Sequence, residues 1–274
     1  MAESICFIGA GNMASAIFGG MIQQGYPASA ITATSPDTAS LATIQQRYQI
    51  HTSSHNPTAV EQADVVILAV KPQIMAAVCR ELQPVLAQRN PLIISIAAGI
   101  PIDALQSWLG QHLAIVRAMP NTPALIGLGA TALYGSDNLS SHQRQLAQRI
   151  HSATGLVQWL PQEQLMDAAT AISGSAPAYF FLMLAAMEEA GIQQGLSADC
   201  ARQLATQTAL GAAAMAQQSE LDPTQLMRNV MSPQGSTEKA IQSLEHNGFR
   251  EMIEQAMQAC AERANEMQRE LGQP

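Results

Sequence analysis

Charged side chains are scarce in this sequence. Only 12% of the 274 residues are Asp, Glu, Lys or Arg, whereas 47% are hydrophobic. The formal net charge is −8, so we expect no nucleic-acid partner, because nucleic acid is bound by basic surfaces. An anionic ligand therefore needs a local positive site. Lysine is rarest, since Lys71 and Lys239 are the only two, and a reaction that depends on lysine must use one of them.

Cysteine is also scarce and scattered. Cys6, Cys79, Cys200 and Cys260 form no Cys-x-x-Cys pair and do not lie near a histidine at metal-ligand spacing. We expect four free, buried, apolar thiols, no metal site and a cytoplasmic location. The N-terminal segment does not resemble a signal peptide. We also expect no membrane contact, because no stretch approaches the roughly 18 apolar residues that span a bilayer.

Short apolar runs alternate with helical patterns through the first 160 residues. This alternation is typical of a parallel sheet with right-handed crossovers. Strands are predicted at 4–9, 30–34, 65–70, 92–96 and 113–118, with weaker signals at 131–134 and 156–159. Helices are predicted at 12–24, 37–48, 73–86, 101–109 and 139–152.

Strand patterns stop after Pro161. Long segments rich in Ala, Met, Leu and Gln follow, and the predicted helices lie at about 162–172, 177–194, 198–218, 223–230, 233–245 and 248–271. The small-residue run 209–215 suits close helix packing or a subunit interface. We therefore expect two domains, an α/β domain at 1–160 and an all-helical domain at 161–274.

A glycine motif lies at the first strand-to-helix junction. It reads Gly9-Ala10-Gly11-Asn12-Met13-Ala14, which matches Gly-x-Gly-x-x-Ala. In a dinucleotide site the first glycine permits the tight turn, and the second lets the backbone approach the pyrophosphate. The small third residue lets the helix pack closely, and the helix N-terminus attracts the phosphate charge. The motif in this context predicts a nicotinamide dinucleotide site.

The end of the second predicted strand bears on the choice of cofactor. NAD-binding domains usually carry Asp or Glu here to hold the ribose 2′-hydroxyl, but this sequence has Ser35. A hydroxyl can donate to a 2′-phosphate, whereas a carboxylate repels it. Asp37 is nearby but better placed to begin a helix. We expect NADP(H) to be preferred, with NAD(H) as the alternative, because no arginine lies beside Ser35.

Three further strand ends carry candidate site residues, namely Lys71 with Pro72, 97–99, and 119–123. Ligands of such sheets bind beyond the carboxyl ends of the strands. Lys71 either lines the site or is a surface lysine before proline. The other two segments form either rigid rims near the nicotinamide or ordinary loops.

Two motifs distinguish the helical domain. In Ser173-Gly-Ser175-Ala-Pro177, Ser175 is a candidate helix N-cap, with Pro177 in the first turn. In Ser232-Pro233-Gln-Gly235-Ser236-Thr237, Ser232 can cap a helix that Pro233 begins. The free N–H groups of the second turn can bind an anion such as a small carboxylate, and an ordinary capped helix is the alternative.

Taken together, and in their order along nearly the whole chain, these motifs resemble those of pyrroline-5-carboxylate reductases. The resemblance implies reduction of 1-pyrroline-5-carboxylate to L-proline by hydride transfer from NAD(P)H. It implies a Rossmann-type domain at 1–160 and a helical substrate-binding and dimerisation domain at 161–274. The partners implied are the small-molecule substrate and a second copy of the chain, and dimers of the family often assemble into decamers.

The resemblance also implies site residues. Cofactor contacts are expected at Gly9, Ala10, Gly11, Asn12, Met13, Ala14, Ser35, Asn56, Ala69, Val70, Lys71, Pro72, Ala97, Ala98, Gly99 and Asn121. Substrate contacts are expected at Ser175, Ser232, Gly235, Ser236 and Thr237, with the Thr237 hydroxyl on the ring nitrogen as the catalytic contact. Gln234 departs from the glycine common in the family, so we expect an ordinary turn or helical conformation there rather than positive φ.

Two other functions remain open at this stage. A β-hydroxyacid dehydrogenase or a general imine reductase shares the two-domain plan. The hydroxyacid enzymes place a catalytic lysine on the first long helix after the α/β domain, and residues 177–194 contain none. A non-catalytic dinucleotide sensor or scaffold would bind the cofactor without oxidising it.

Overall fold

The computed structural model describes residues 2–272 of the chain. It divides into two compact units, one formed by Met1–Ser175 with Ala259–Pro274 and the other by Ala176–Gln258. We call them unit 1 and unit 2 and describe each by itself. The expected boundary at 160/161 differs from this division because the helical segment up to Ser175 and the end of the last helix pack in unit 1. As a boundary between functions, 160/161 stays a proposal.

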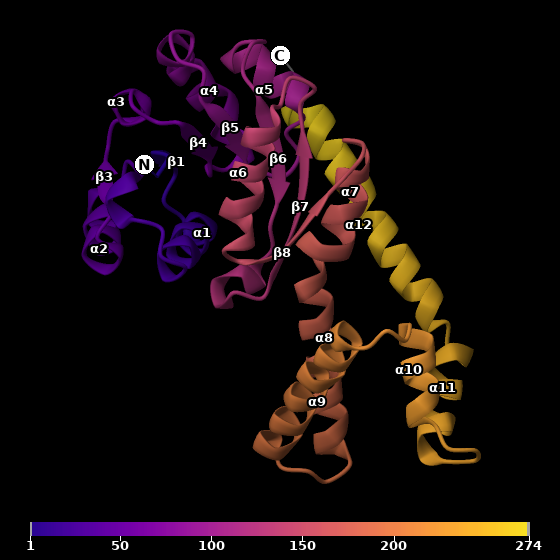
Figure 1. The fold of residues 1–274 in the computed structure, drawn as a ribbon. Coiled ribbons are helices and arrows are strands. Elements are labelled where there is room, and N and C mark those ends of the chain that lie inside the picture. The colour runs from indigo at the N-terminus through magenta and orange to yellow at the C-terminus, as the bar shows by residue number, and fades with distance from the viewer. Residues whose placement is uncertain (1, 273–274) are drawn as a thin grey trace. The chain divides into compact units, whose positions relative to one another are not determined.

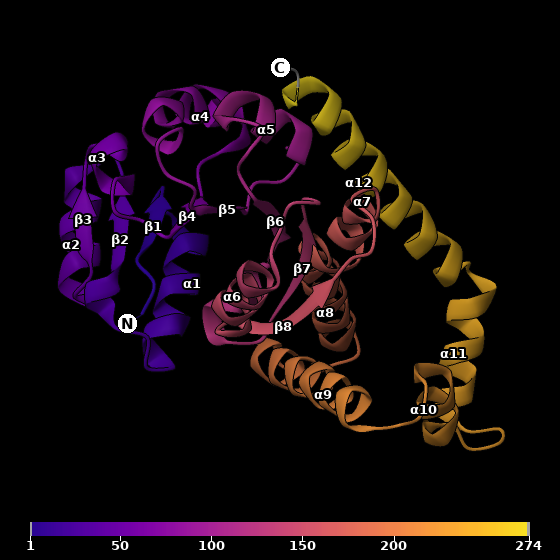
Figure 2. The ribbon, with the colours of Figure 1, turned by 45° about the horizontal axis from the view of Figure 1, so that its top comes forward.

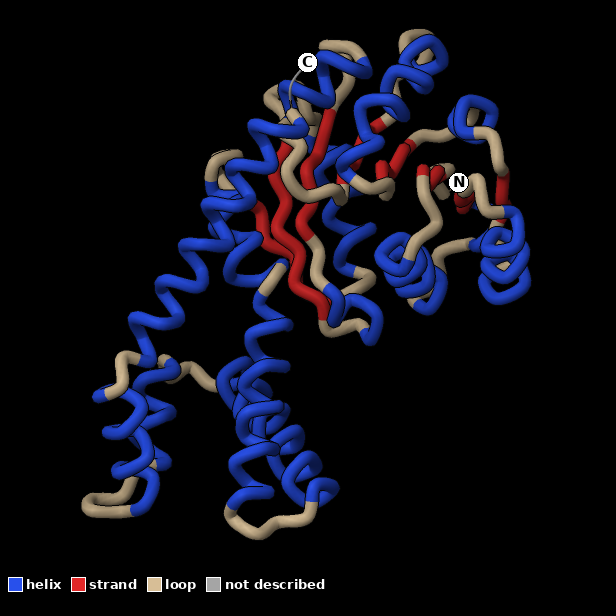
Figure 3. The backbone as a smooth tube through the Cα atoms, turned by 180° about the vertical axis from the view of Figure 1, so that it is seen from behind, coloured by secondary structure: helices blue, strands red, loops and turns tan. Residues whose placement is uncertain are grey.

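Unit 1 is built on one eight-stranded sheet (Figures 1 and 3). Its strand order is β3-β2-β1-β4-β5-β6-β7-β8. The strands are β1 (Ile5–Ile8), β2 (Ile31–Thr34), β3 (His51–Ser53), β4 (Val65–Leu68), β5 (Leu92–Ser95), β6 (Ile115–Met119), β7 (Gly129–Gly135) and β8 (Gly155–Trp159). All neighbours are parallel except β6 and β7. The predicted Rossmann-type sheet is thereby confirmed.

Helices cover both faces of the sheet, which explains the uninterrupted apolar strands. One face packs on α1 (Asn12–Gln23), α2 (Thr38–Tyr48) and α6 (Ser141–Ser152), and its core includes Phe7 and Phe18. The other packs on α3 (Asn56–Val60), α4 (Pro72–Leu86) and α5 (Ile102–Leu109), and its core includes Cys6 and Met75. Successive residues of β1 point to opposite faces, so both must be apolar.

The sequence patterns missed β3, α3, two short 3₁₀ helices and one strand direction. β3 and α3 are too short and polar to give a hydrophobic period. β7 runs antiparallel to β6 because only the short 3₁₀ helix η2 (Thr122–Ile126) connects them. A parallel pair needs a crossover of a dozen or more residues.

Unit 2 is entirely helical in the part of the chain described. It contains α8 (Ala176–Gln193), α9 (Ala198–Gln218), α10 (Pro223–Val230), α11 (Ser236–His246) and the first part of α12 (Phe249–Leu271). The last part of α12 belongs to unit 1 and lies beside α5 (Figure 2). Leu271 packs there against the core that α4 and α5 share. The helices predicted at 198–218, 223–230 and 248–271 agree with α9, α10 and α12 to within about one residue, whereas the one predicted at 233–245 begins later, at Ser236.

The first long helix after the sheet is continuous from Leu165 to Gln193. It comprises α7 (Leu165–Ala169), a π-helical turn at Thr170–Gly174, which we call the π-turn, and α8. Ser175 has helical φ and ψ of −92° and −23°, so the prediction that it is an N-cap is wrong. No helix begins there, because the π-turn carries the backbone directly into α8.

The same helix is long and apolar enough, by length and composition, to cross a membrane. The expectation that no such stretch exists is therefore wrong. Glycine, alanine and serine interrupt the large apolar residues and conceal the run from simple inspection. Core helices of water-soluble proteins pass the same test, so this finding alone is weak evidence for a membrane.

The four cysteines are free thiols, as predicted, but only two are fully buried. Burial raises the pKa of both Cys6 and Cys79 to about 12. Cys200 and Cys260 are half-buried. The expectation of four buried thiols is therefore correct for Cys6 and Cys79 alone, because α9 and α12 leave much of their surface uncovered.

His151, near the end of α6, is a buried histidine without a hydrogen-bond partner for either ring nitrogen within residues 2–272. Burial lowers its pKa from 6.5 to about 4. The folded state thus favours the neutral ring, and its full stability is present above pH 6.5. As the pH falls from 6.5 towards 4, the unfolded chain gains a proton that the folded chain does not.

We predict that His151 makes the free energy of unfolding about 3 kcal/mol lower at pH 4 than at pH 7. His151→Leu should remove that part of the pH dependence in urea unfolding followed by circular dichroism. His51→Leu, at an exposed residue of the edge strand β3, is the control and should keep the wild-type dependence. Equal pH dependence in the His151 variant and the wild type would contradict the prediction.

Candidate functional site

The predicted cofactor residues of unit 1 lie mostly at one edge of the sheet. Residues 9–14 follow β1, Ser35 follows β2, 69–72 follow β4 and 97–99 follow β5. These four strands are neighbours and parallel, so their carboxyl ends meet at the same edge. The fold therefore brings together segments up to about 90 residues apart.

Gly9 joins three of these strand ends. Its N–H donates to the Thr34 carbonyl at 3.1 Å, while the N–H of Ala69 donates to the Ile8 carbonyl at 2.8 Å. The φ of Gly9 is +101°, and a Cβ added there would lie 2.7 Å from the Ala69 carbonyl oxygen. Only glycine fits this position, on both conformational and steric grounds.

Gly11 and the start of α1 form an open helix N-terminus. Gly11 is the N-cap, and a Cβ added to it would meet nothing within 4 Å. Glycine provides no side-chain cap, so the first N–H groups of α1 remain available for an anion. Ala14 is 1% exposed and holds the helix against the sheet. This cradle fits the pyrophosphate of a dinucleotide.

The residues after β2 carry no free carboxylate. Asp37 caps α2, accepting from the N–H groups of Ala39 at 3.0 Å and Ser40 at 3.2 Å, as predicted. The Ser35 hydroxyl oxygen accepts from the N–H of Asp37 at 3.1 Å. Ser35 is half-buried at this edge, so its hydroxyl can also meet a ligand.

Asn56 supports the same edge from α3. Its Oδ1 accepts from the Thr34 hydroxyl at 2.7 Å, and its Nδ2 donates to Glu81 on α4 at 3.3 Å. The structure thus places Asn56 beside the end of β2, although sequence patterns had not predicted α3. The side chain of His55 caps that short helix by accepting from the N–H of Thr58 at 3.3 Å.

The next two strand ends differ in exposure. Lys71 is the exposed N-cap of α4, and Pro72 is its first residue. Gly99, by contrast, is buried with φ of +75°, and a Cβ added there would lie 3.0 Å from the Cβ of Met267 on α12. Lys71 is therefore open to a ligand, whereas Gly99 mainly allows α12 to approach closely.

Asn121 lies at the end of the next strand, and its amide already has protein partners. Its Oδ1 accepts from the N–H of Ala130 at 2.9 Å, and its Nδ2 donates to the Ser173 carbonyl at 3.0 Å. The residue is 8% exposed. A direct cofactor contact of Asn121 stays a prediction.

Sequence reasoning missed an ion pair within unit 1. Arg117 on β6 is 3% exposed, and its guanidinium lies 2.6 Å from the Glu163 carboxylate. The same Glu163 oxygen accepts from the N–H of Ile102 at the start of α5, at 2.9 Å. An arginine inside an apolar strand was the available signal, because a buried charge needs a partner. The pair ties β6 to the start of α5.

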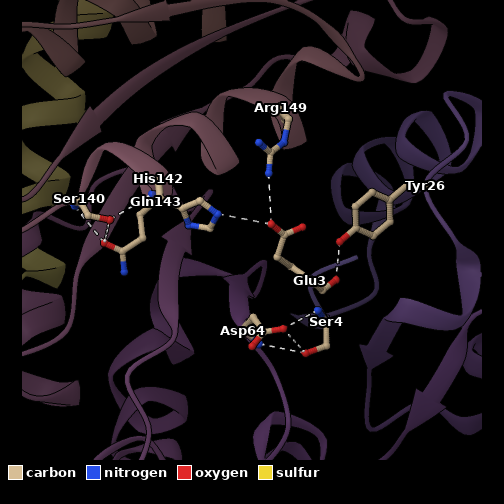
Figure 4. Close-up of polar contacts among 8 residues, drawn as sticks. All are labelled: Glu3, Ser4, Tyr26, Asp64, Ser140, His142, Gln143 and Arg149. Carbon is tan, nitrogen blue, oxygen red and sulfur yellow. Dashed lines mark hydrogen bonds and ion pairs between the residues drawn. The ribbon is translucent and has the colours of Figure 1, made fainter. Parts of the chain in front are cut away.

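The opposite edge of the sheet carries a second polar cluster (Figure 4). Tyr26 donates its hydroxyl to the Glu3 carbonyl, and the Glu3 carboxylate lies 3.3 Å from Arg149. Desolvation, followed by the charge of Glu3, raises the pKa of Tyr26 to about 12. These residues flank the start of β1, away from the carboxyl ends, and fasten the N-terminal segment.

The predicted substrate turn, residues 232–237, belongs to unit 2. Gln234 has φ of +58°, so the expectation of an ordinary conformation at this position is wrong. Left-handed backbone costs a residue with a side chain roughly 1–2 kcal/mol. The N–H of Gln234 also donates to the Glu238 carboxylate at 2.7 Å, which offsets part of that cost.

Glycine is required at position 235 because the turn leaves no space for a side chain, and not because of a positive φ such as that of Gln234. The φ of Gly235 is −77°, which any residue can adopt, but a Cβ added there would lie 2.9 Å from the Ser232 carbonyl oxygen. Its N–H donates to the Ser232 carbonyl at 2.9 Å. The close approach closes the turn and excludes a side chain.

The helix after this turn begins later than predicted. Gly235 is the N-cap and Ser236 the first residue of α11, so Ser232 does not cap it and Pro233 does not begin it. The bond from Gly235 to Ser232 forms a separate tight turn first. The predicted anion site is thereby moved to the N–H groups of Ser236 and Thr237. Ser236 is exposed and Thr237 is half-buried.

Two family models match the chain. Residues 4–99 match the family model described as “NADP oxidoreductase coenzyme F420-dependent”. Residues 163–267 match the family model described as “Pyrroline-5-carboxylate reductase dimerisation”. The first covers the glycine motif and the strand ends through β5. The second covers the π-turn, the substrate turn and most of α12.

Relatives match over nearly the full length. A pyrroline-5-carboxylate reductase of Pseudomonas aeruginosa is 49% identical over 269 residues, covering 98% of each chain. The solved structure of one from Coxiella burnetii has a TM-score of 0.93 and 41% identity, covering 97% of this chain and 99% of that one. A Plasmodium falciparum pyrroline carboxylate reductase with NADP bound has a TM-score of 0.86 and 30% identity, covering 97% and 98%.

Proposed function

The chain belongs to the pyrroline-5-carboxylate reductase family, and from this premise we propose how its residues carry out the family's reaction. The enzyme is an NAD(P)H-dependent oxidoreductase that reduces the carbon–nitrogen double bond of 1-pyrroline-5-carboxylate and forms L-proline. The observation that carries this function is the 49% identity over 98% of both chains. The open helix N-terminus at Gly11 supplies independent physical support.

Unit 1 is proposed to hold the cofactor. The pyrophosphate fits the N-terminus of α1 at Gly11, and the edge formed by Ser35, Asn56, 69–72 and 97–99 surrounds the remaining parts. When bound, the reduced nicotinamide supplies the hydride. The protein's own contribution is to fix the orientation of the reactants, since a protonated imine is already electrophilic.

The turn in unit 2 is proposed to hold the substrate. The N–H groups of Ser236 and Thr237 point from a helix N-terminus, which favours a carboxylate. Ser232, Gly235 and Ser175 complete the proposed substrate contacts. The Thr237 hydroxyl is proposed to hydrogen-bond the ring nitrogen as hydride reaches the adjacent carbon. The nitrogen gains its proton from water, or the substrate binds already as the iminium.

We further propose a preference for NADPH, which rests on Ser35 and on the NADP-bound relative. Ser35→Asp should raise the KM for NADPH about ten-fold and leave that for NADH within about two-fold, because the new carboxylate repels the 2′-phosphate. Initial rates with each cofactor measure both constants. Ser54→Asp adds the same charge at an exposed neighbouring position and should leave the ratio unchanged. An unchanged ratio in Ser35→Asp would remove Ser35 from cofactor selection.

Unit 2 provides the surface for self-association. In α8, Phe180, Phe181 and Leu182 are 62%, 64% and 73% exposed. A helix that is apolar on all sides is normally covered, and the dimerisation family model includes this helix. We propose that a second copy of the chain covers α8 in a homodimer and that dimers assemble into a decamer. We also propose that the enzyme is cytoplasmic and bound to no membrane. Sedimentation without detergent measures the assembly.

One assay separates the functions left open by the sequence. Purified enzyme is mixed with NADPH or NADH, and the loss of reduced-nicotinamide absorbance is followed after addition of 1-pyrroline-5-carboxylate. Oxidation that depends on this substrate supports the proposal. A dinucleotide sensor would bind cofactor without oxidation, and a hydroxyacid dehydrogenase would respond only to a hydroxyacid with the oxidised cofactor.

A further inference from the structure

The π-turn leaves one backbone carbonyl dependent on a side chain from the loop after β6. The N–H of Ser175 donates to the Thr170 carbonyl at 2.9 Å, five residues earlier. In a regular α-helix the carbonyl of Ser173 would accept from residue 177, but Pro177 has no N–H. Such π-turns occur often at functional sites. Here the turn immediately precedes Ser175.

Asn121 satisfies that carbonyl. Its Nδ2 donates to Ser173 at 3.0 Å, while its Oδ1 accepts from the N–H of Ala130 at the start of β7, at 2.9 Å. The two bonds hold the amide from opposite ends. Asparagine has both a donor and an acceptor on this short side chain, whereas aspartate can only accept.

Two neighbouring contacts hold the same segment. A Cβ added to Gly174 would lie 2.4 Å from the Cε of Met119, so the missing side chain makes room for this methionine. The thiol of Cys260 on α12 donates to the Ser175 hydroxyl oxygen at 3.2 Å. The end of β6 and α12 thus contact the last residue of the π-turn and the residue that follows it.

We infer that Asn121 is a positioning residue for the reaction and that it acts through the Ser173 carbonyl on Ser175. This inference rests on the proposed function, in which Ser175 contacts the substrate. On this inference, the motif around Asn121 and the motif around Ser175 together position the substrate. This positioning role replaces the direct cofactor contact predicted for Asn121 from the family resemblance, because both ends of its amide are engaged by the protein. A change at Asn121 should therefore affect the substrate and not the cofactor.

Asn121→Asp is the sharpest test, because it keeps the acceptor for Ala130 and replaces the donor to Ser173 by a carboxylate oxygen. We expect the KM for 1-pyrroline-5-carboxylate to rise about ten-fold, with the Kd for NADPH, measured by fluorescence titration, within about two-fold of wild type. Asn138→Asp is the matched control. Asn138 likewise accepts from Ser136 and donates to the His112 carbonyl, at 2.6 and 3.1 Å, and its variant should keep wild-type constants.

A double-mutant cycle tests the route through Ser175. If Asn121 acts through this residue, Asn121→Asp should add little to the KM of Ser175→Ala. Asn121→Ala, which removes both bonds of the amide without adding a charge, should raise the same KM and serves if Asn121→Asp unfolds. Additive effects, or a weakened NADPH affinity with the substrate KM unchanged, would overturn the inference. No turnover by the wild-type enzyme would overturn the proposed function and this inference together.

Discussion

Gly9→Ala is expected to weaken NADPH binding about a hundred-fold, equivalent to about 3 kcal/mol. The new methyl group would lie 2.7 Å from the Ala69 carbonyl oxygen, at a φ of +101°. Backbone of β1 and β4 cannot separate without breaking the bond from Ala69 to Ile8, which is 2.8 Å long. The turn must therefore shift, and the N-terminus of α1 shifts with it. Titration of NADPH fluorescence measures the affinity.

Two matched glycine variants separate the causes. Gly25→Ala introduces a side chain at φ of +89° with nothing within 4 Å, so it should lower stability by about 1 kcal/mol and leave the affinity intact. Gly11→Ala should fold normally, because its Cβ also meets no protein atom within 4 Å. It should bind NADPH more weakly, because the new methyl group occupies the space that the pyrophosphate is proposed to approach. Wild-type affinity in Gly9→Ala would show that the dinucleotide does not depend on this turn.

Thr237→Ala is expected to lower kcat about 10- to 100-fold with the fold and NADPH affinity preserved. The proposed hydrogen bond to the reacting nitrogen is lost, and a bond of this kind contributes roughly 1.5–3 kcal/mol when one partner is charged. Thr237 is the second residue of α11 and half-buried, so removing its hydroxyl creates no large cavity. Steady-state kinetics with saturating cofactor measure the effect.

The controls for this prediction are a conservative variant and an equivalent position. Thr237→Ser keeps the hydroxyl and should retain most of the activity. Thr224→Ala changes the second residue of α10, in the same unit and also after a helix N-cap, and should retain wild-type kcat. Equal loss in the Thr224 and Thr237 variants would indicate a general effect of helix ends. An unchanged rate in Thr237→Ala would remove its hydroxyl from the mechanism.

Local patterns were reliable where neighbouring residues decide the structure. The uninterrupted apolar run at 65–70 predicted β4, and Asp37 was correctly predicted to begin α2. An N-cap acts within three residues, so its signal lies in the local sequence. The same locality explains the errors: Ser175 and Pro177 have the composition of a helix start, yet the chain arrives at them already helical.

The candidate site divides in the same way. The glycine motif and the family resemblance predicted the residues gathered at the edge of the sheet. The bridge from Asn121 to Ser173 joins residues 52 positions apart and has no local pattern. The left-handed backbone at Gln234 was predicted wrongly, although the glycine common in the family at this position was the available signal.

The sequence by itself determined the alternation of strands and helices, the glycine turn and the order of the motifs, because these depend on residues close along the chain. Only the tertiary structure decided which groups meet across the sheet edge, why Gly9 tolerates no side chain, and what Asn121 holds. Those properties depend on distances between backbone atoms of separate elements. Such distances are settled when the elements pack, not when each one forms.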